Sequence, residues 1–393
     1  MSNSKLEQII NDLGINYKKS NIILRSATFE DASSIIDLYT EAYNDTYPYP
    51  PWNNRDYVKA AIKDSKIRWM VFEDTNGTLA GTNFVEINNE TETAINHGAI
   101  IKKEFRGYGL GRRTILDSYL EIMKKEEVDL GWCEARTAHK KSQKMLIKGG
   151  YIPVGFLPHK DNFLGKKESD LIFVWYNYKK NVFEKRRKDV KIISEILPLY
   201  NYVSDFLNEP LNKPKIENWE KHDMSIHTNI SISIENKGNN YIEMVLEVDE
   251  NNFISFKINQ EINMAEGFKI SVQKGNKKAF DSLLYVINEI FHDKLDYIEI
   301  WISAYEPERQ KSCIMLGFIP TGYIPAIEIN NEEKREDKIV FIKSRSYPKT
   351  CNQEIDNLKL IDRIKILFEL FKYNQKTIEN QNWSNKNDES RKC

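Results

Sequence analysis

The sequence predicts a two-domain chain of the α/β (α+β) class, and three observations carry this prediction. The chain has 393 residues, which is enough for two domains of ordinary size, each with its own buried core. Short β-rich runs alternate with segments of 3.6-residue apolar periodicity through most of the sequence. A segment near residue 150 recurs near residue 317, which indicates that one structural unit occurs twice.

The composition is that of a globular protein without an excess of either charge. Hydrophobic residues make up 40% of the chain, charged residues make up 29%, and the formal net charge is -1. Because a general nucleic-acid binder needs a basic excess to meet phosphates, this balance argues against such a role. The sequence contains no apolar signal core and no run of about 18 apolar residues, so we expect a cytoplasmic protein that does not bind membranes.

The cysteines indicate neither a disulfide framework nor a metal centre. The four cysteines lie far apart, in no C-x-x-C pair and with no histidine at metal-ligand spacing. We therefore expect a reducing compartment and no bound metal. The four are Cys133, Cys313, Cys351 and Cys393.

The first predicted elements are a helix, a strand and two further helices. An amphipathic helix is expected within residues 1–20, followed by a β-rich run at 22–28. The segment 29–43 has helical periodicity, and a second helical stretch lies near 54–64. A loop rich in proline and aromatic residues separates these two helices.

A hairpin and five further elements complete the first domain. The hairpin is expected at 67–87, because Asn76-Gly77 is a strong turn signal between two β-rich runs. The remaining elements are a strand at 93–102, a helix at 112–128, a strand at 130–136, a helix at 140–150 and a strand at 170–178. The resulting order is β-α-α-β-β-β-α-β-α-β.

The rest of the chain divides by composition into three parts. With the first domain at 21–180, residues 181–219 are expected to form a charged helical connector. A second β-rich domain is expected at 220–347. Residues 348–393 combine one helix with a polar, Asn-rich end that we expect to be disordered.

The internal repeat aligns without a gap. The segment "QKMLIKGGYIPVGFLP" (143–158) matches "QKSCIMLGFIPTGYIP" (310–325), and the offset is 317 − 150 = 167 at every pair. The segment is not low in complexity, so the match predicts a structural duplication. Identical pairs are Gln143/Gln310, Lys144/Lys311, Gly150/Gly317, Ile152/Ile319, Pro153/Pro320, Gly155/Gly322 and Pro158/Pro325.

The stretch "FRGYGLGRR" (105–113) follows the predicted fourth strand and opens a helix. Its Arg106, Gly109 and Gly111 form the pattern R-x-x-G-x-G. Glycines let a backbone turn tightly, and the N–H groups at a helix start together with the helix dipole favour an anion. The natural ligand is a pyrophosphate. A solvated basic turn is the simpler reading, since a lone glycine-rich pattern is a weak signal.

In this position the motif resembles the coenzyme A loop of the GNAT acyltransferases. Residues 22–178 resemble one complete GNAT domain, and 220–346 resemble a second, diverged copy. The resemblance implies a mixed, mostly antiparallel sheet in each, splayed between strands four and five, with acetyl-CoA as acyl donor in the splay. Residues implied to bind the coenzyme are Ala99, Ile100 and Ile101 on strand four, then Arg106, Gly107, Tyr108, Gly109, Leu110, Gly111 and Arg112, and also His139.

One helix departs from the family's pattern. Members usually carry Asn-x-x-Ala…Tyr after strand five, where this chain has His139, Ser142 and Leu146. The family's tyrosine commonly protonates the departing thiolate, which Leu146 cannot do. A coenzyme A thiol is acidic enough to leave with help from solvent, so activity is still expected.

Acyl transfer to an amine needs a base that keeps the amine neutral when it attacks. His97 on the predicted fourth strand alternates with Ala99 and Ile101, so we expect it to face the splay, and an unperturbed pKa near ~6.5 suits the task. Glu134 on strand five and Glu86 on strand three are weaker candidates. A structural histidine and solvated or ion-paired carboxylates are the alternatives.

The loop between the first two helices is where the family commonly builds its acceptor pocket. Here the loop carries "TYPYPPW". An aromatic wall for an amine or apolar acceptor would consist of Tyr43, Tyr47, Tyr49 and Trp52. A packed loop stiffened by its prolines is the alternative.

The repeat predicts one coenzyme site in the two copies. At the position of the first loop the second copy has "VQKGNKKAF" (272–280), which places Asn276 opposite Gly109 and Lys278 opposite Gly111. We therefore expect an N-acetyltransferase that moves the acyl group of acetyl-CoA to a primary amine of a small molecule. The alternatives are a non-catalytic acyl-CoA sensor or partner-binding protein, and an acetyltransferase that acts on a protein or peptide amine.

Overall fold

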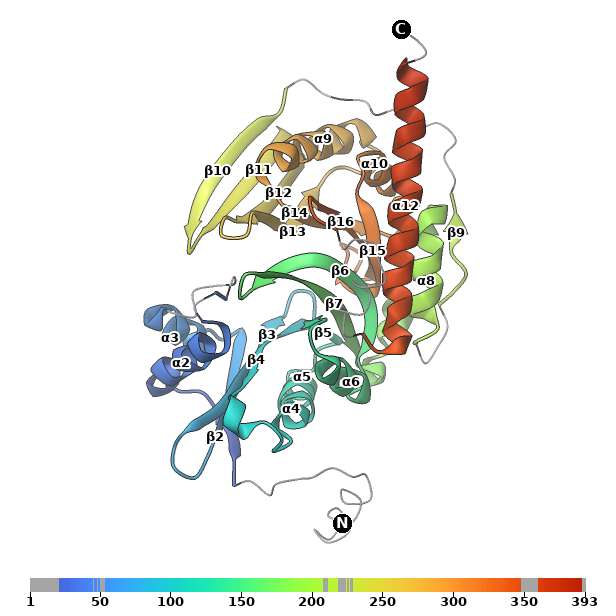
Figure 1. Cartoon of the computed structure of the whole chain (residues 1–393). Coiled ribbons are helices and arrows are strands. Elements are labelled where there is room, and N and C mark those ends of the chain that lie inside the picture. The colour runs from blue at the N-terminus through green and yellow to red at the C-terminus, as the bar shows by residue number, and fades with distance from the viewer. Residues whose placement is uncertain are drawn as a thin grey trace. The chain divides into compact units, whose positions relative to one another are not determined.

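The computed structural model of the chain describes residues 21–44, 46–47, 49, 54–207, 211–217, 224, 226, 229–347 and 360–390. The helix predicted within residues 1–20 lies outside these residues. The chain forms two compact units (Figure 1). Unit 1 comprises residues 1–133, 144–150 and 163–165, and unit 2 comprises residues 134–143, 151–162 and 166–393.

Unit 1 is built on a mixed, mostly antiparallel sheet. Its strands are β1 (Ile23–Ser26), β2 (Ile67–Glu73), β3 (Leu79–Asn88), β4 (Thr93–Ile101) and the first part of β5 (Leu130–Arg136). The first four strands pair in sequence order and antiparallel, as consecutive hairpins do. Strand β5 instead runs parallel to β4, because a helical crossover separates the two strands.

Helices bury apolar side chains on both faces of this sheet. The helices α2 (Ala32–Tyr43) and α3 (Arg55–Lys63) pack on one face, where Ile35 and Val58 meet Trp69 and Phe84 in one buried cluster. A second cluster on the other face joins Phe72 to residues of the next helix. Alternate residues of β2 therefore serve different cores, as expected for a strand covered on both faces.

The crossover after β4 is one helical stretch with an irregular middle. It begins at α4 (Leu110–Arg113), continues through a π-helical turn, η3 (Thr114–Tyr119), and ends with α5 (Leu120–Lys125). A short 3-10 turn, η2 (Lys103–Phe105), precedes it. A π-helical turn inserts an extra residue into a helix and often marks a functional site.

Strands β4 and β5 pair over three positions only. The paired residues are Thr93 to Ile95 on β4 and Leu130 to Trp132 on β5. No pairing of the two strands is recorded beyond Ile95 among the described residues of unit 1. The sheet therefore opens along the second half of β4, in the place that the GNAT resemblance implies.

Unit 2 contains the remaining strands and four longer helices. Its strand order is β5-β7-β6-β15-β16-β14-β13-β12-β11-β10, in which β13 and β14 are parallel. The strands are β6 (Ile152–Phe163), β7 (Lys166–Tyr176), β10 (Ser231–Gly238), β11 (Tyr241–Asp249), β12 (Asn252–Asn259), β13 (Met264–Ser271), β14 (Tyr297–Ser303), β15 (Ile319–Ile329) and β16 (Arg335–Ser344). The longer helices are α8 (Leu197–Ser204), α9 (Lys277–Lys294), α10 (Pro307–Met315) and α12 (Asp362–Ser390), and α6 (Lys140–Lys148) is divided between the units.

The repeated segments lie at matching places in unit 2. Gly155 of β6 pairs with its repeat partner, Gly322 of β15. A Cβ atom at Gly322 would lie 3.0 Å from the Cα atom of Gly155. The repeated glutamine also has a shared role, because Gln143 accepts the backbone N–H of Ile361 and Gln310 accepts that of Ile193. The repeated glycine is therefore retained where two backbones approach closely.

Three predictions about elements were wrong or incomplete. Strand β6 was not predicted, because Pro153 and Pro158 interrupt its strand pattern. Among its described residues the connector is helical at α7 (Val182–Lys185), at the 3-10 turn η5 (Ser194–Ile196) and at α8, and it also contributes the two short paired strands β8 (Lys191–Ile192) and β9 (Lys215–Ile216). The Asn-rich end is helical to Ser390, so the expectation of disorder from composition was wrong there.

Candidate functional site

The glycine loop between β4 and α4 has the backbone geometry that an anion site requires. Gly107 and Gly109 have φ values of 94° and 75°, in the left-handed region that favours glycine. Gly109 is the N-cap of α4, and no side chain caps the helix. The first N–H groups of this helical stretch therefore have no side-chain acceptor at the end where the dipole favours negative charge.

The third glycine of the motif has a packing role. A Cβ atom at Gly111 would lie 2.8 Å from the Met145 Cε atom of α6. A Cβ atom at Gly107, by contrast, would meet nothing within 4 Å. The loop therefore needs Gly107 for its backbone conformation and Gly111 for close packing of helix against helix.

The three arginines of the loop differ in their contacts. Arg113 donates to the carbonyl of Ile22 at 2.7 Å and pairs with Asp117 at 3.1 Å, so its charge has a structural use. Arg106 is exposed and donates through Nε to the carbonyl of Ile101 at 3.2 Å. Arg112 is exposed and contacts no partner among the described residues. Arg106 and Arg112 are thus the charges that remain for a ligand.

A β-bulge interrupts β4 just before the predicted coenzyme-binding edge. Thr82 pairs with Ile100 and Phe84 pairs with His97, so two residues of β4, Gly98 and Ala99, lie opposite one residue of β3. The predicted alternation of His97 with Ala99 and Ile101 was wrong for this reason. Beyond the bulge Ile100 packs with the α2–α3 cluster and Ile101 packs with the α4 cluster.

His97 lies on the α2–α3 face of the sheet with part of its ring exposed. Its side chain is 41% exposed, and its ring stacks on Phe84 with centroids 5.1 Å apart. The Nε2 atom is 3.9 Å from the Glu86 carboxylate. The exposed part of the ring leaves room for an approaching group.

An aromatic cluster lies beside the end of α2. The Tyr43 and Tyr47 rings have centroids 4.7 Å apart, and Tyr49 lies 5.7 Å from Tyr47. Phe163, at the tip of the β6–β7 hairpin, packs against Tyr43 at 5.5 Å. The structure thus brings together three of the four predicted acceptor residues, while Trp52 lies outside the described residues.

Phe163 was not predicted as part of this cluster. It is 116 residues beyond Tyr47, on a strand that the prolines concealed. A hydrogen bond of 3.1 Å from the backbone of Leu164 to the Thr46 hydroxyl holds the same hairpin tip against the loop. A pattern that marked β6 as a strand would have predicted the β6–β7 hairpin, but not the contact of its tip with Tyr43.

Glu134, the second candidate base, belongs to unit 2 and is bound to a lysine. The Lys160 ammonium lies 2.6 Å from Glu134 and 3.0 Å from Glu299, and its side chain is only 3% exposed. Burial raises the pKa of Glu134 to about 8. The nearby Glu299 carboxylate also raises this pKa, whereas Lys160 lowers it. Burial also raises the pKa of Glu266 to about 7. Glu134 is therefore a carboxyl that is 23% exposed, is ion-paired with Lys160 and has a raised pKa.

The helix after β5 begins beside His139. This residue directly precedes α6, and its carbonyl accepts a 3.0 Å hydrogen bond from the Ser142 hydroxyl. Leu146, on the same helix, is 4% exposed and serves the core. The structure offers no hydroxyl at the position of Leu146 to protonate a leaving thiolate.

Unit 2 has a second opening between parallel strands. Strands β13 and β14 pair only at Met264 and Ala265. A cavity of about 220 Å³ lies farther along. Arg309 lines it and donates to the carbonyl of Val272 at 2.7 Å, so a side chain of the protein already hydrogen-bonds to the backbone at this place. The cavity is lined by Ile270, Val272, Lys274, Trp301, Ile302, Ser303, Glu306, Arg309, Glu328, Glu336 and Lys338.

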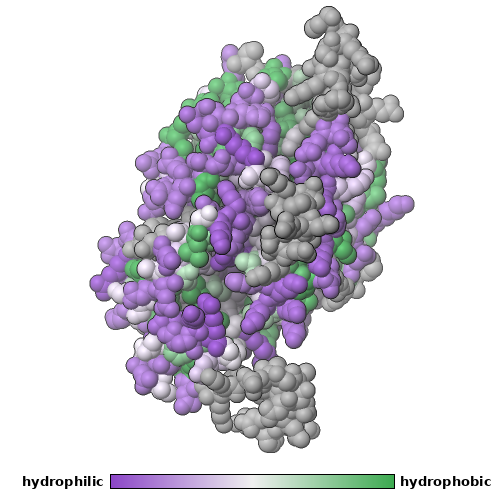
Figure 2. All heavy atoms as spheres, viewed as in Figure 1, coloured by the Kyte–Doolittle hydropathy of each residue, from purple (hydrophilic) through white to green (hydrophobic). Residues whose placement is uncertain are grey.

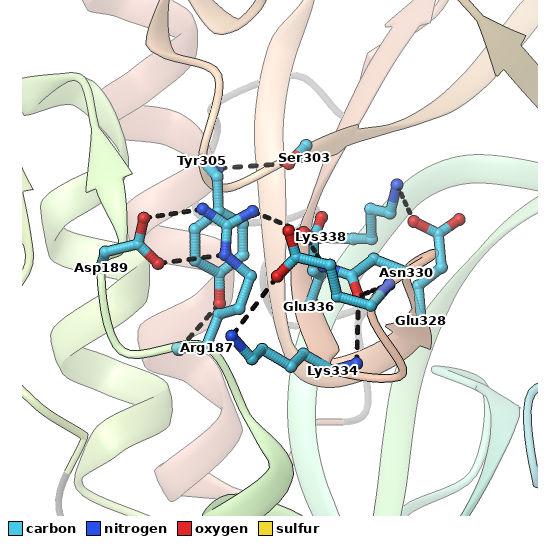
Figure 3. A network of polar contacts seen from close by, with 10 residues as sticks. Arg187, Asp189, Ser303, Tyr305, Glu328, Asn330, Lys334, Glu336 and Lys338 are labelled. Carbon is cyan, nitrogen blue, oxygen red and sulfur yellow. Dashed lines mark hydrogen bonds and ion pairs between the residues drawn. The ribbon is translucent and has the colours of Figure 1, made fainter. Parts of the chain in front are cut away.

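The polar wall of this cavity is made of paired charges (Figure 3). Lys338 is bound to Glu328, and Glu336 is bound to Arg187 at 2.5 Å. The Arg187 guanidinium also lies 4.1 Å from the centroid of the Tyr305 ring. Since these groups satisfy one another, most of the wall offers no unpaired charge to a phosphate.

The start of α9 also differs from the start of α4 in a way that disfavours a phosphate. The side chain of Asn276 accepts the backbone N–H of Ala279 and so caps α9. In unit 1 the corresponding N–H groups have no side-chain acceptor. The loop in unit 2 therefore lacks the uncapped helix start that suits a pyrophosphate.

Metal-ligand groups and membrane-spanning helices are both absent from the described residues. Among them, no group of three His, Cys, Asp or Glu side chains is arranged to hold a metal ion. No helix in the described part of the chain is long and apolar enough to cross a bilayer. The face in Figure 2 is mostly hydrophilic, which agrees with the charged composition.

Comparison with known proteins gives structural likenesses only. No protein-family model and no curated protein matches the sequence. The structure resembles spermidine N-acetyltransferase from Vibrio cholerae, solved in complex with CoA and spermine, with 20% identity over 40% of this chain and 97% of that chain, and a TM-score of 0.36. It also resembles ribosomal-protein-S5-alanine acetyltransferase from Vibrio fischeri, with 16% identity over 41% of this chain and 96% of that chain, and a TM-score of 0.36. Likenesses at this level do not assign the chain to a family.

Proposed function

We propose that this protein is an N-acyltransferase that uses acetyl-CoA as its acyl donor. The observation that carries the proposal is the loop from Arg106 to Arg112, where Gly109 begins a helix with no side-chain cap beside an opened sheet edge. The uncapped N–H groups and two arginines suit a pyrophosphate. Strand β5 does not pair with β4 from Ala99 to Ile101. The backbone of this edge can therefore form hydrogen bonds with the amide groups in the arm of coenzyme A.

In the proposed reaction the acceptor nitrogen attacks the thioester carbon. A C–N bond forms, the C–S bond breaks, and the sulfur leaves with the electron pair as the coenzyme A thiolate. A base takes the proton of the amine, and the thiolate takes a proton from solvent, since Leu146 offers none. His97 in unit 1 and Glu134 in unit 2 are the candidate bases, and the exposed imidazole of His97 favours it.

The acceptor that we propose is a primary amine of a small molecule. The cluster of Tyr43, Tyr47, Tyr49 and Phe163 offers ring faces, and aromatic faces attract ammonium groups. This cluster lies in unit 1, as does the glycine loop. The rings also pack against one another, so an apolar acceptor is the main competitor for this surface.

The second half of the chain is proposed to be a diverged copy of the first. Support comes from the seven identical residue pairs that lie 167 positions apart. Gln143 and Gln310 also share a role, because each accepts a backbone N–H. The order β10 to β14, then β16 and β15, repeats the order β1 to β5, then β7 and β6. In the proposed division at 21–180 and 220–347, the second domain shapes or supports the first and binds no coenzyme.

Release of free thiol from acetyl-CoA with a panel of primary amines tests the proposed function. We expect amine-dependent release by the full chain. We expect at most background release by the variant Arg106→Ala/Gly109→Asp, because a carboxylate would then face the phosphates. Gly238→Asp is the matched control, since Gly238 has φ 77° and open space around it. Background release with every amine, despite tight binding of acetyl-CoA, would favour the non-catalytic sensor.

A further inference from the structure

We propose that Tyr39 and Tyr119 are positioning residues that set the edge of β4 for the acyl donor. The inference rests on the proposed use of acetyl-CoA. Both tyrosines belong to unit 1, Tyr39 on α2 and Tyr119 at the end of the π-helical turn η3. Both lie at the β-bulge that begins the predicted donor-binding edge.

The two hydroxyl groups hold consecutive carbonyls of the bulge. The Tyr119 hydroxyl donates to the carbonyl of His97 at 2.9 Å, and the Tyr39 hydroxyl donates to the carbonyl of Gly98 at 3.2 Å. Each tyrosine is 3% exposed, and burial raises the pKa of both hydroxyls well above the ordinary value. Both groups therefore stay protonated and remain donors at any pH at which the protein works.

Because each peptide unit is planar, these two hydrogen bonds also fix the direction of the N–H group that follows each carbonyl. In a trans peptide the C=O and the following N–H point in opposite directions. With the carbonyl of Gly98 turned to Tyr39, the N–H of Ala99 must point away from Tyr39. With the carbonyl of His97 turned to Tyr119, the N–H of Gly98 must point away from Tyr119. The hydroxyls thus fix the direction of the first backbone donors of the edge.

The bulge also decides which residues of β4 face which core. Because of the extra residue, Ile100 packs on the α2–α3 side and Ile101 on the α4 side. If the extra residue of the bulge were lost, the register would change by one and the side chains that follow would change face. Gly98 has φ 60°, and a Cβ atom there would lie 2.2 Å from the Tyr39 hydroxyl oxygen, so only glycine fits beneath this bond.

A further contact comes from the residue that faces the bulge. Asn83 on β3 is fully buried, and the Ser118 hydroxyl donates to its Oδ1 atom at 2.5 Å. Ser118 and Tyr119 are neighbours on the π-helical turn. The irregular turn thus delivers two adjacent hydroxyl groups to the two strands that form the bulge. A regular helix, which lacks the extra residue, would rotate the residues that follow by about 100° and move Tyr119 away.

The test uses the full chain with Tyr39→Phe, Tyr119→Phe and the double variant. These changes keep the rings and remove only the hydroxyls. We expect each single variant to bind acetyl-CoA about fivefold more weakly in calorimetry, and the double variant more than tenfold more weakly. The KM for acetyl-CoA should rise by the same factors, while the KM for the amine should change by less than about twofold.

Tyr176→Phe is the matched control. The Tyr176 hydroxyl also donates to a buried backbone carbonyl, that of Pro325 at 2.8 Å, but in unit 2. We expect a similar loss of thermal stability in the control with unchanged affinity for acetyl-CoA. If the double variant binds acetyl-CoA as tightly as the control, the inference is wrong. If the unaltered chain binds no acetyl-CoA, the proposed function fails, and the inference fails with it.

Discussion

At the scale of single residues, the pH dependence of the rate tests whether Glu134 is the base. Burial raises the pKa of Glu134 to about 8. A base must be deprotonated to act, so the rate should rise through the pKa of whichever group serves. We expect kcat/KM, measured from pH 5 to 9, to show no rise centred near pH 8, because His97 is the more exposed of the two candidates.

His97→Ala should confirm this assignment through the rate. We expect kcat to fall by about a hundredfold, with the KM for acetyl-CoA within about twofold of the unaltered value. His292→Ala is the control, because the His292 ring also packs on a phenylalanine, Phe291, with centroids 5.5 Å apart, but in unit 2. A pH profile that keeps its limb in His97→Ala and loses it in Glu134→Gln would assign the base to Glu134 instead.

Among the residues of the site, the local sequence pattern predicted the turn of the glycine loop, but it did not predict ion pairs between residues far apart in the chain. The glycines of "FRGYGLGRR" were predicted to turn the chain, and Gly107 and Gly109 have the left-handed φ that this requires. The pairing of Glu134 and Glu299 with Lys160 could not be predicted, because Lys160 and Glu299 are 26 and 165 positions from Glu134. Such pairs depend on how strands associate, which single-sequence periodicity does not report.

At the scale of elements, strands with a clear pattern were predicted and irregular strands were not. The prediction of a strand over 130–136 agrees with β5 at both ends. Strand β6 was missed because two prolines interrupt it, and the bulge in β4 was missed because period-two alternation assumes a regular strand. The irregular places are also where the proposed site lies, as expected when function requires a departure from local preference.

The contact between β6 and β15 provides a prediction about stability. In Gly322→Ala the new methyl carbon would lie 3.0 Å from both the Gly155 Cα and the Val154 carbonyl oxygen. We expect the free energy of unfolding in urea to fall by about 1–3 kcal/mol, the usual cost of overpacking. Gly155→Ala should cost less, since its closest contact is a flexible Ile172 methyl at 3.2 Å. Equal stability of both variants and the unaltered chain would refute the close backbone approach.

At the scale of the whole molecule, the proposal is that two copies of one arrangement hold a single coenzyme. In unit 1 the helix start at Gly109 has no side-chain cap, whereas in unit 2 Asn276 caps α9. In unit 2, moreover, Arg309 already donates to the carbonyl of Val272. Both differences lower the expected affinity of unit 2 for a coenzyme, by removing the phosphate donors and by occupying the strand edge.

Calorimetric titration of the full chain with acetyl-CoA tests this central claim most directly. The account predicts one molecule of acetyl-CoA per chain, and binding that is lost in Arg106→Ala/Gly109→Asp but kept in Gly238→Asp. Two molecules per chain, or unchanged binding in the loop variant, would contradict it.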